Sequence, residues 1–246
     1  MSLPRLAVAV LLAAPLVAQV PEGAVHMRLV SVTVPTWRHS PFTASVDTQW
    51  VRQLSDGTTI TLKNHRTIAR DNAGRVFQER RQLVPDDGQH KSDITEIDIL
   101  DPVAHLRYIC YPDANTCHAS QFNGMPASRP DDLPHVTTAR KENLGSKDFD
   151  GFQATGTLED GVISSGAIGN DTPISVTREF WYSPKLGFNL SSHRHDPRFG
   201  TQTFEVSNIV AGQPDPKLFQ VPEGFKILRE GVPPSLYHDN RDEPTR

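Results

Sequence analysis

The sequence predicts one all-β domain, built on a single strongly curved antiparallel sheet with few or no helices. Apolar and polar residues alternate with period two from Phe42 onward, as they do in half-buried strands. Turn-forming sequences such as Asp56-Gly57 separate these runs at short intervals. No amphipathic helical pattern interrupts them. Roughly ten strands in a chain of 246 residues can curve around a core of their own.

The first half of the domain is predicted to be a meander of six strands. The run that starts at Phe42 places Ala44, Val46 and Trp50 on one side and polar residues on the other. Four more strands are expected at 58–70, 75–83, 93–100 and 104–110, and a sixth strand runs back after the Cys110–Cys117 turn toward Ser120. Residues 27–34 are a candidate for one further strand.

Residues 122–139 contain three prolines and interrupt the alternating strand pattern, which indicates a long surface loop or a lid. Strand patterns resume afterwards, and Pro216 to Leu228 is the last segment with apolar residues to bury. The strands expected in this half are 141–144, 151–158, 174–182, 188–195 and 201–209. The charged tail over 230–246 is expected to be disordered.

The N-terminus is typical of a secretory signal peptide. Arg5 precedes the apolar run from Leu6 to Ala18, which is too short to cross roughly 30 Å of hydrocarbon as a helix. We expect cleavage after Ala18, a single β domain over 24–229, and a periplasmic or secreted location; an uncleaved anchor is the alternative. Without Arg5 the mature chain has 24 basic and 29 acidic side chains, a net charge of −5.

Composition excludes several classes of protein. The near balance of charge argues against a general nucleic-acid binder. Two cysteines are too few for a four-cysteine zinc site. No later segment is long and apolar enough for a transmembrane helix, and no motif requires a cofactor.

Cys110 and Cys117 flank the turn-rich segment around Pro112 and Asn115. Two strands joined by such a turn bring their flanking positions within reach of a disulfide, and an oxidising compartment favours its formation. A redox-active dithiol is the alternative, although the spacing is not C-x-x-C.

Several motifs of the C-terminal half resemble a family of uncharacterised exported bacterial proteins. They are Trp181-Tyr182-Ser183-Pro184, then Asp196-Pro197-Arg198-x-Gly200, then Asp215-Pro216-x-Leu218-Phe219-x-Val221-Pro222. The layout is also similar, more distantly, to envelope proteins of the lipoprotein-carrier kind. That resemblance implies an incomplete barrel whose concave face takes acyl chains or a partner protein.

On this basis we expect a non-enzymatic envelope protein that binds an apolar ligand, a lipid or a lipoprotein segment, on its concave face. Six aromatic residues are the candidates for an apolar groove: Trp50, Phe77, Phe180, Trp181, Phe188 and Phe204. A protein-interaction or sensor module, acting through sheet edges or the 122–139 loop, is the alternative function.

An enzyme is the third hypothesis. His193 and His195 lie on one side of a strand, and Asp196 follows them, which is a partial metal-ligand set. A solvated strand end before an Asp-Pro turn explains the same residues more simply. The arginines between Arg66 and Arg81 either form a cationic stripe or pair across strands with acidic neighbours.

Overall fold

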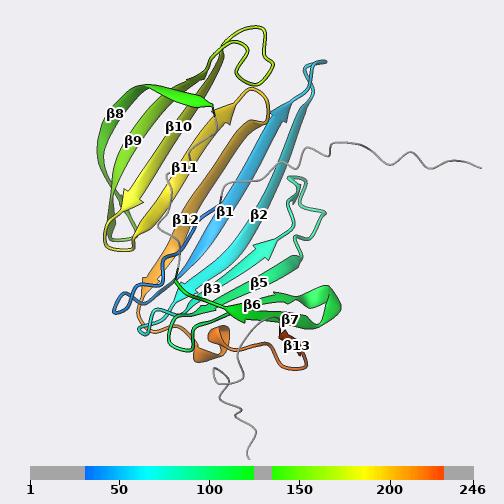
Figure 1. Ribbon diagram of the computed structural model, residues 1–246, viewed down its shortest axis with the longest axis vertical. Coiled ribbons are helices and arrows are strands. Elements are labelled where there is room, and N and C mark those ends of the chain that lie inside the picture. Colours follow the sequence, from blue (N-terminus) through cyan, green and yellow to red (C-terminus); the bar gives the residue numbers. More distant parts are fainter. Residues whose placement is uncertain (1–30, 125–134, 230–246) are drawn as a thin grey trace, which may run out of the picture.

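Thirteen strands form one continuous sheet in the computed structural model, which describes residues 31–124 and 135–229 (Figure 1). The strands are β1 (Phe42–Gln53), β2 (Thr59–Arg70), β3 (Val76–Arg81), β4 (Val84–Pro85), β5 (Ile94–Asp101), β6 (Leu106–Tyr111), β7 (Thr116–Gln121), β8 (Val136–Phe149), β9 (Phe152–Ile163), β10 (Ile174–Ser183), β11 (Phe188–Asp196), β12 (Gly200–Ala211) and β13 (Lys226–Arg229). The expected signal peptide, the tail over 230–246 and the centre of the 122–139 loop lie outside the described residues.

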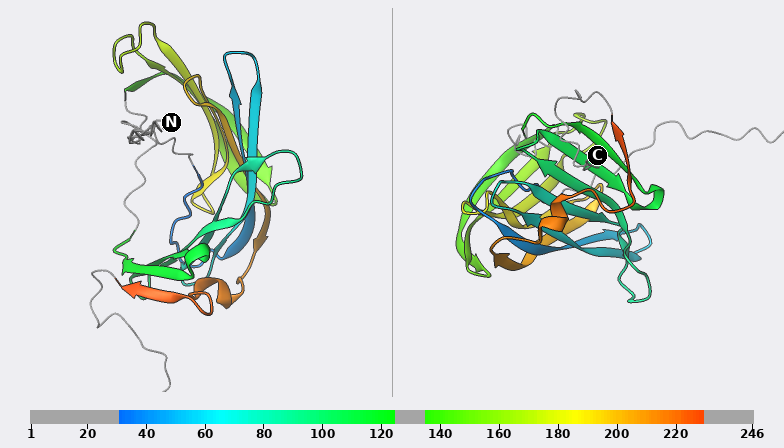
Figure 2. Two further views of the ribbon diagram at one scale, coloured as in Figure 1. Left: turned by 90° about the vertical axis from the view of Figure 1, so that its right-hand side faces the viewer. Right: turned by 90° about the horizontal axis from the view of Figure 1, so that it is seen from below.

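The sheet is open and strongly curved (Figure 2). Its strand order is β13-β7-β6-β5-β3-β2-β1-β12-β11-β10-β9-β8, and β4 pairs separately with β2. Neighbouring strands are antiparallel, except that β13 runs parallel to β7. Because β8 and β13 are separate edges, the sheet does not close into a barrel. The predicted fold class is therefore confirmed.

Helical structure in the described residues consists of two short 3-10 turns, η1 (Pro112–Ala114) and η2 (Pro216–Phe219). No helix within 31–124 or 135–229 is long and apolar enough to cross a membrane. η1 forms the turn between β6 and β7, which places Cys110 directly opposite Cys117. These two cysteines form a disulfide, as predicted.

Two elements differ from the sequence-based expectation. β8 spans Val136–Phe149, whereas only 141–144 was expected to be extended. Most of its residues are exposed, so the strand lacks the apolar alternation that reveals a half-buried strand. Residues 31–34, the described part of the expected strand over 27–34, are not in a strand.

Instead, residues 31–41, which we call the strap, run along the concave side of the sheet, seen in dark blue in Figure 2. Val32 and Val34 are buried there in the larger apolar core. The sheet supplies the rest of this core, including Phe42, Ala44, Val46, Ile68, Val76, Leu100, Phe152, Phe188, Leu190, Phe204 and Val206. The strap thus covers part of the concave face with apolar side chains.

A smaller core lies on the other face of the sheet. Ala69, Phe77 and Ile99 point away from the strap and pack with Phe219 of η2. Strands in this part of the sheet consequently bury both faces, as the adjacent buried residues Val76 and Phe77 show.

Arg70 attaches the strap to the sheet. Its side chain is fully buried, and its guanidinium donates to the carbonyls of Pro35 (2.9 Å), Ser40 (2.9 Å) and Leu186 (3.0 Å). It also donates to the Ser40 hydroxyl. Pro35 and Ser40 belong to the strap and Leu186 to the β10–β11 turn, so one side chain joins two segments far apart in the chain.

Gly187 makes room for the same junction. Its φ is +84°, and a Cβ atom built on it would lie 2.5 Å from the indole ring of Trp37. A side chain here would therefore displace the strap as well as strain the turn.

Replacing both cysteines with alanine should lower the free energy of unfolding by about 2 kcal/mol, because the disulfide restricts the unfolded chain. Urea titration of the oxidised wild type and the double variant measures the difference. The reduced wild type is the control and should match the variant. Equal stability of the oxidised wild type and the variant would contradict this expectation.

Arg70→Met should cost about 3 kcal/mol, because it removes the donor from three backbone carbonyls, of which that of Leu186 is buried. Urea unfolding at neutral pH gives the value. Arg52→Met removes an exposed arginine of β1 and serves as the control, with a change within about 0.5 kcal/mol. A similar effect of both substitutions would show that Arg70 does not hold the strap.

Candidate functional site on the concave face

Strand register decides which side chains reach the concave face. On β2, Arg66 and Arg70 both bind the strap, Arg66 through the hydroxyl of Ser31. Successive side chains of a strand point to opposite faces, so the even-numbered residues of β2 face the concave side. Residues that pair directly across strands share a face, and the strand register extends this assignment to the neighbouring strands.

Three aromatic residues come together on this face. Phe204 of β12 lies opposite Thr48 on one side and Ser192 on the other, and Ser192 lies opposite Phe180 of β10. Trp50 is two residues beyond Thr48 on the same face of β1. We call Trp50, Phe204 and Phe180 the aromatic stripe. Trp50 and Phe204 are buried, and Phe180 is half-buried.

The other three residues of the predicted apolar groove are not in this row. Phe188 belongs to the larger core, as Phe204 does, and its ring lies 5.5 Å from that of Phe42. Trp181 packs against that core beside Phe149. Phe77 lies in the smaller core on the opposite face. The six aromatic residues therefore do not line one surface.

Polar side chains share the concave face with the stripe. Thr48, Ser192 and Asn64 occupy the same cross-strand row as Phe204. Asn64 donates through Nδ2 to the carbonyl of Arg81, while its buried Oδ1 has no hydrogen-bond partner among the described residues. This part of the concave face therefore has aromatic rings and hydrogen-bonding groups side by side.

Ion pairs border the stripe at β9, β10 and β11. Arg178, in the row next to Phe180, donates to Glu159 at 2.6 Å, and Lys141 lies 3.0 Å from the same carboxylate. Burial tends to raise the pKa of Glu159, but hydrogen bonds from Lys141 and Arg178 outweigh it and hold that pKa below its ordinary value. Glu159 therefore stays ionised between two cations.

Asp196 organises the turn between β11 and β12. It accepts from the Arg198 guanidinium at 2.9 and 2.7 Å and from the Arg198 backbone N–H at 3.0 Å. Arg194 lies 3.6 Å away. Burial tends to raise the pKa of Asp196, but the hydrogen bonds from Arg198 lower it below its ordinary value. In the same turn, the carbonyl oxygen of Phe199 accepts a hydrogen bond from the indole N–H of Trp50, with 2.8 Å between nitrogen and oxygen.

The metal-ligand candidates do not converge. His195 lies 2.9 Å from the Thr201 hydroxyl, while Asp196 points to the opposite face toward its arginines. Across residues 31–124 and 135–229, no three histidine, cysteine or acidic side chains form an arrangement suited to a metal ion.

His193 instead borders a groove of about 670 Å³ beside the 84–92 segment. The groove is also lined by residues of β1, β2, β11, β12 and the 84–92 segment: Asp47, Thr48, Gln49, Lys63, Asn64, His65, Val84, His90, Ser92, Ser191, Ser192, Thr203, Phe204 and Glu205. His65 is bound to Asp47 and His90 to Asp87, each at 2.7 Å, and Lys63 pairs with Asp86. Several polar side chains of this groove thus already have hydrogen-bond or ion-pair partners.

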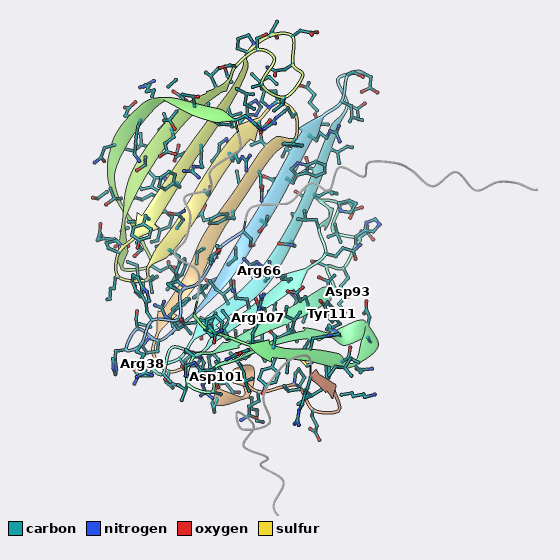
Figure 3. The ribbon with its side chains drawn as sticks, in the orientation of Figure 1. Arg38, Arg66, Asp93, Asp101, Arg107 and Tyr111 are labelled. Atoms are coloured by element: carbon teal, nitrogen blue, oxygen red, sulfur yellow. A yellow bond between two sulfur atoms is a disulfide. The ribbon has the colours of Figure 1, made fainter. Side chains whose placement is uncertain are left out.

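The arginines between Arg66 and Arg81 divide into two groups. Arg75, Arg80 and Arg81 pair with acidic side chains, but only the pair of Arg80 and Glu96 crosses between strands. Figure 3 labels Arg66 of the other group. Arg66 and Arg70 are buried without a carboxylate partner among the described residues. Sequence reasoning did not separate the two groups, because alternation alone does not show that a strap covers one face.

Comparison with known proteins gives fold neighbours at low similarity. No protein-family model matches the chain, and no curated protein matches it. An uncharacterised conserved protein from Thermus thermophilus is 9% identical, with a TM-score of 0.42, over 78% of this chain and 91% of that one. A chain of the Pseudomonas aeruginosa MucA/MucB complex is 14% identical, with a TM-score of 0.41, over 80% of this chain but only 62% of that one.

A LolA superfamily protein from Nitrosomonas europaea is also among the neighbours. It is 8% identical, with a TM-score of 0.28, over 75% of this chain and 91% of that one.

Asp196→Asn should destabilise the protein by about 2 kcal/mol at neutral pH, because it weakens charge-assisted hydrogen bonds to Arg198. A carboxyl group whose pKa is lowered on folding stabilises fully above its unfolded pKa, near 3.8, and loses this effect as pH falls through the folded value. The difference from wild type should therefore shrink well below pH 4.

Urea unfolding at pH 7 and at the lowest pH where both proteins fold tests this. Asp93→Asn, in an exposed carboxylate, is the control and should be nearly neutral at both values. A difference between Asp196→Asn and wild type that stays constant with pH would contradict the assignment.

Proposed function

We propose that this is an exported, non-enzymatic envelope protein that binds the apolar part of a lipid or lipoprotein on its concave face. The observation that carries the proposal is the aromatic stripe on the concave face of an open sheet. Phe180 remains half-buried in this position, with the guanidinium of Arg178 4.8 Å from its ring centroid.

The open edges support this proposal physically. An acyl chain gains about 0.8 kcal/mol for each methylene removed from water, and a curved aromatic wall removes many methylenes at once. A sheet without closure can receive such a chain from the side, whereas a closed small barrel is filled by its own side chains.

The edge strand β8 gives less support to the alternative function, a protein-interaction or sensor module. β8 is long, but its ladder is irregular between Thr138 and Arg140 and between Asn143 and Gly145. It also carries the exposed charges of Arg140, Lys141 and Lys147. Bulges and edge lysines are the usual protection against strand addition.

Phe180→Ser should weaken binding of a neutral apolar probe, the methyl ester of cis-parinaric acid, roughly ten-fold, since it removes a large apolar contact. Fluorescence titration of the purified mature chain measures the affinity. Val210→Ser is the matched control, because Val210 is an exposed apolar residue on the convex face. Its affinity should equal that of wild type.

Native mass spectrometry of the exported protein provides an independent readout. We expect additional mass from co-purified lipid in the wild type and less of it in Phe180→Ser. A bare protein mass together with no binding of the ester would overturn the proposed function.

A further inference from the structure

Arg66 is a buried cation with too few partners. Its side chain is only 4% exposed. Nη2 donates to the Ser31 hydroxyl at 2.6 Å, and Nη1 donates to the carbonyl of Glu79 at 3.2 Å. A guanidinium carries five N–H donors, so three of them have no acceptor within the described part of the chain.

No carboxylate among the described residues lies within hydrogen-bond distance of Arg66. The Glu79 carboxylate accepts from the Thr67 backbone N–H and from Arg81, both at 3.0 Å, on the other side of the strands, and Glu96 pairs with Arg80. Desolvation and the positive charge of Arg80 lower the pKa of Arg66 to about 10, although the negative charge of Glu79 acts in the opposite direction. Arg66 therefore remains charged at neutral pH, in a place that disfavours its charge.

Arg70 shows what a satisfied arginine looks like on the same face. It is four residues away on β2 and equally lacks a carboxylate, but carbonyls, a hydroxyl and the ring of Phe42 surround its guanidinium. Its burial is explained by the attachment of the strap. No comparable structural role uses all the donors of Arg66.

The register places Arg66 beside the aromatic stripe. Arg66 lies opposite Val46, and the row of Thr48 and Phe204 follows two residues along, about 7 Å away at strand spacing. Trp50 lies a further two residues along. An anionic group at Arg66 would thus be continuous with an apolar chain lying along the stripe.

We infer that Arg66 binds the anionic group, a carboxylate or phosphate, of an amphiphile whose apolar part lies on the aromatic stripe. This inference rests on the proposed function and assigns a charge to its ligand. The anion would accept hydrogen bonds from the three remaining N–H groups of Arg66, which an uncharged lipid could not do in the same way.

The test compares cis-parinaric acid with its methyl ester, two probes that differ in charge but share the same chain. Wild type should prefer the acid about ten-fold, since a charge-assisted hydrogen bond contributes at least that factor. Arg66→Gln should abolish this preference and leave ester binding unchanged. Arg52→Gln, an exposed arginine on the same face of β1, should retain the preference.

Each outcome decides between the two hypotheses. Binding of neither probe to wild type would reject the proposed function. Equal binding of acid and ester would preserve that function and overturn the role of Arg66. If Arg52→Gln also lost the preference for the acid, that preference would come from the net charge of the protein and not from a contact with Arg66. Inorganic phosphate bound as tightly as the acid would assign Arg66 to free anions instead.

Thermal unfolding followed by circular dichroism establishes that Arg66→Gln is folded. If it does not fold, the wild type decides by its preference between the two probes, and Arg66→Lys provides the second variant. Arg66→Lys retains the charge, so it should still prefer the acid, with reduced affinity. A lysine variant that binds acid and ester equally would contradict a site that recognises charge.

Discussion

The guanidinium of Arg70 is the contact on which the concave face depends. It joins backbone carbonyls of the strap and of the β10–β11 turn to the end of β2. Backbone acceptors cannot move away by a change of rotamer, so this one side chain fixes where two chain segments cross the sheet. The apolar contacts of Val32 and Val34 and the ring pair of Phe42 and Phe188 follow from that placement.

Exposed and buried cations of the sheet have different partners. Exposed or peripheral cations such as Lys63, Arg80 and Arg198 meet carboxylates, as expected where water competes for both partners. Arg66 and Arg70 do not, and burial lowers the pKa of each to about 10. Both remain protonated at neutral pH, so this part of the concave face holds two guanidinium groups that have no carboxylate of the described residues within hydrogen-bond distance.

Much of the fold follows from patterns that a sequence displays openly. The alternation from Phe42 to Trp50 predicted both the strand and its buried face, and the turn around Pro112 predicted the hairpin and its disulfide. Phe77 shows the limit of this reasoning. It alternates with Val76, yet both are buried, because η2 covers the second face of the sheet. Which segment covers a face depends on long-range packing, and strand periodicity carries no information about that packing.

The same limit explains why Arg66 was seen only as one member of a basic run. Its type and spacing are those of Arg80, which is exposed and paired. What distinguishes Arg66 is that it is buried, binds Ser31 of the strap and has no carboxylate within hydrogen-bond distance, and all of these depend on tertiary structure. An open sheet must cover its concave face or leave apolar side chains in water. The chain covers one part with the strap, and Arg70 is fully used in holding it. Arg66 binds Ser31 at one end of that part and has unused donors, and it lies on the same face as Trp50, which is not part of the larger core. An amphiphile with an anionic group would give Arg66 hydrogen-bond acceptors and would cover the aromatic rings with its apolar part. A purely apolar ligand would leave the buried charge of Arg66 without a partner.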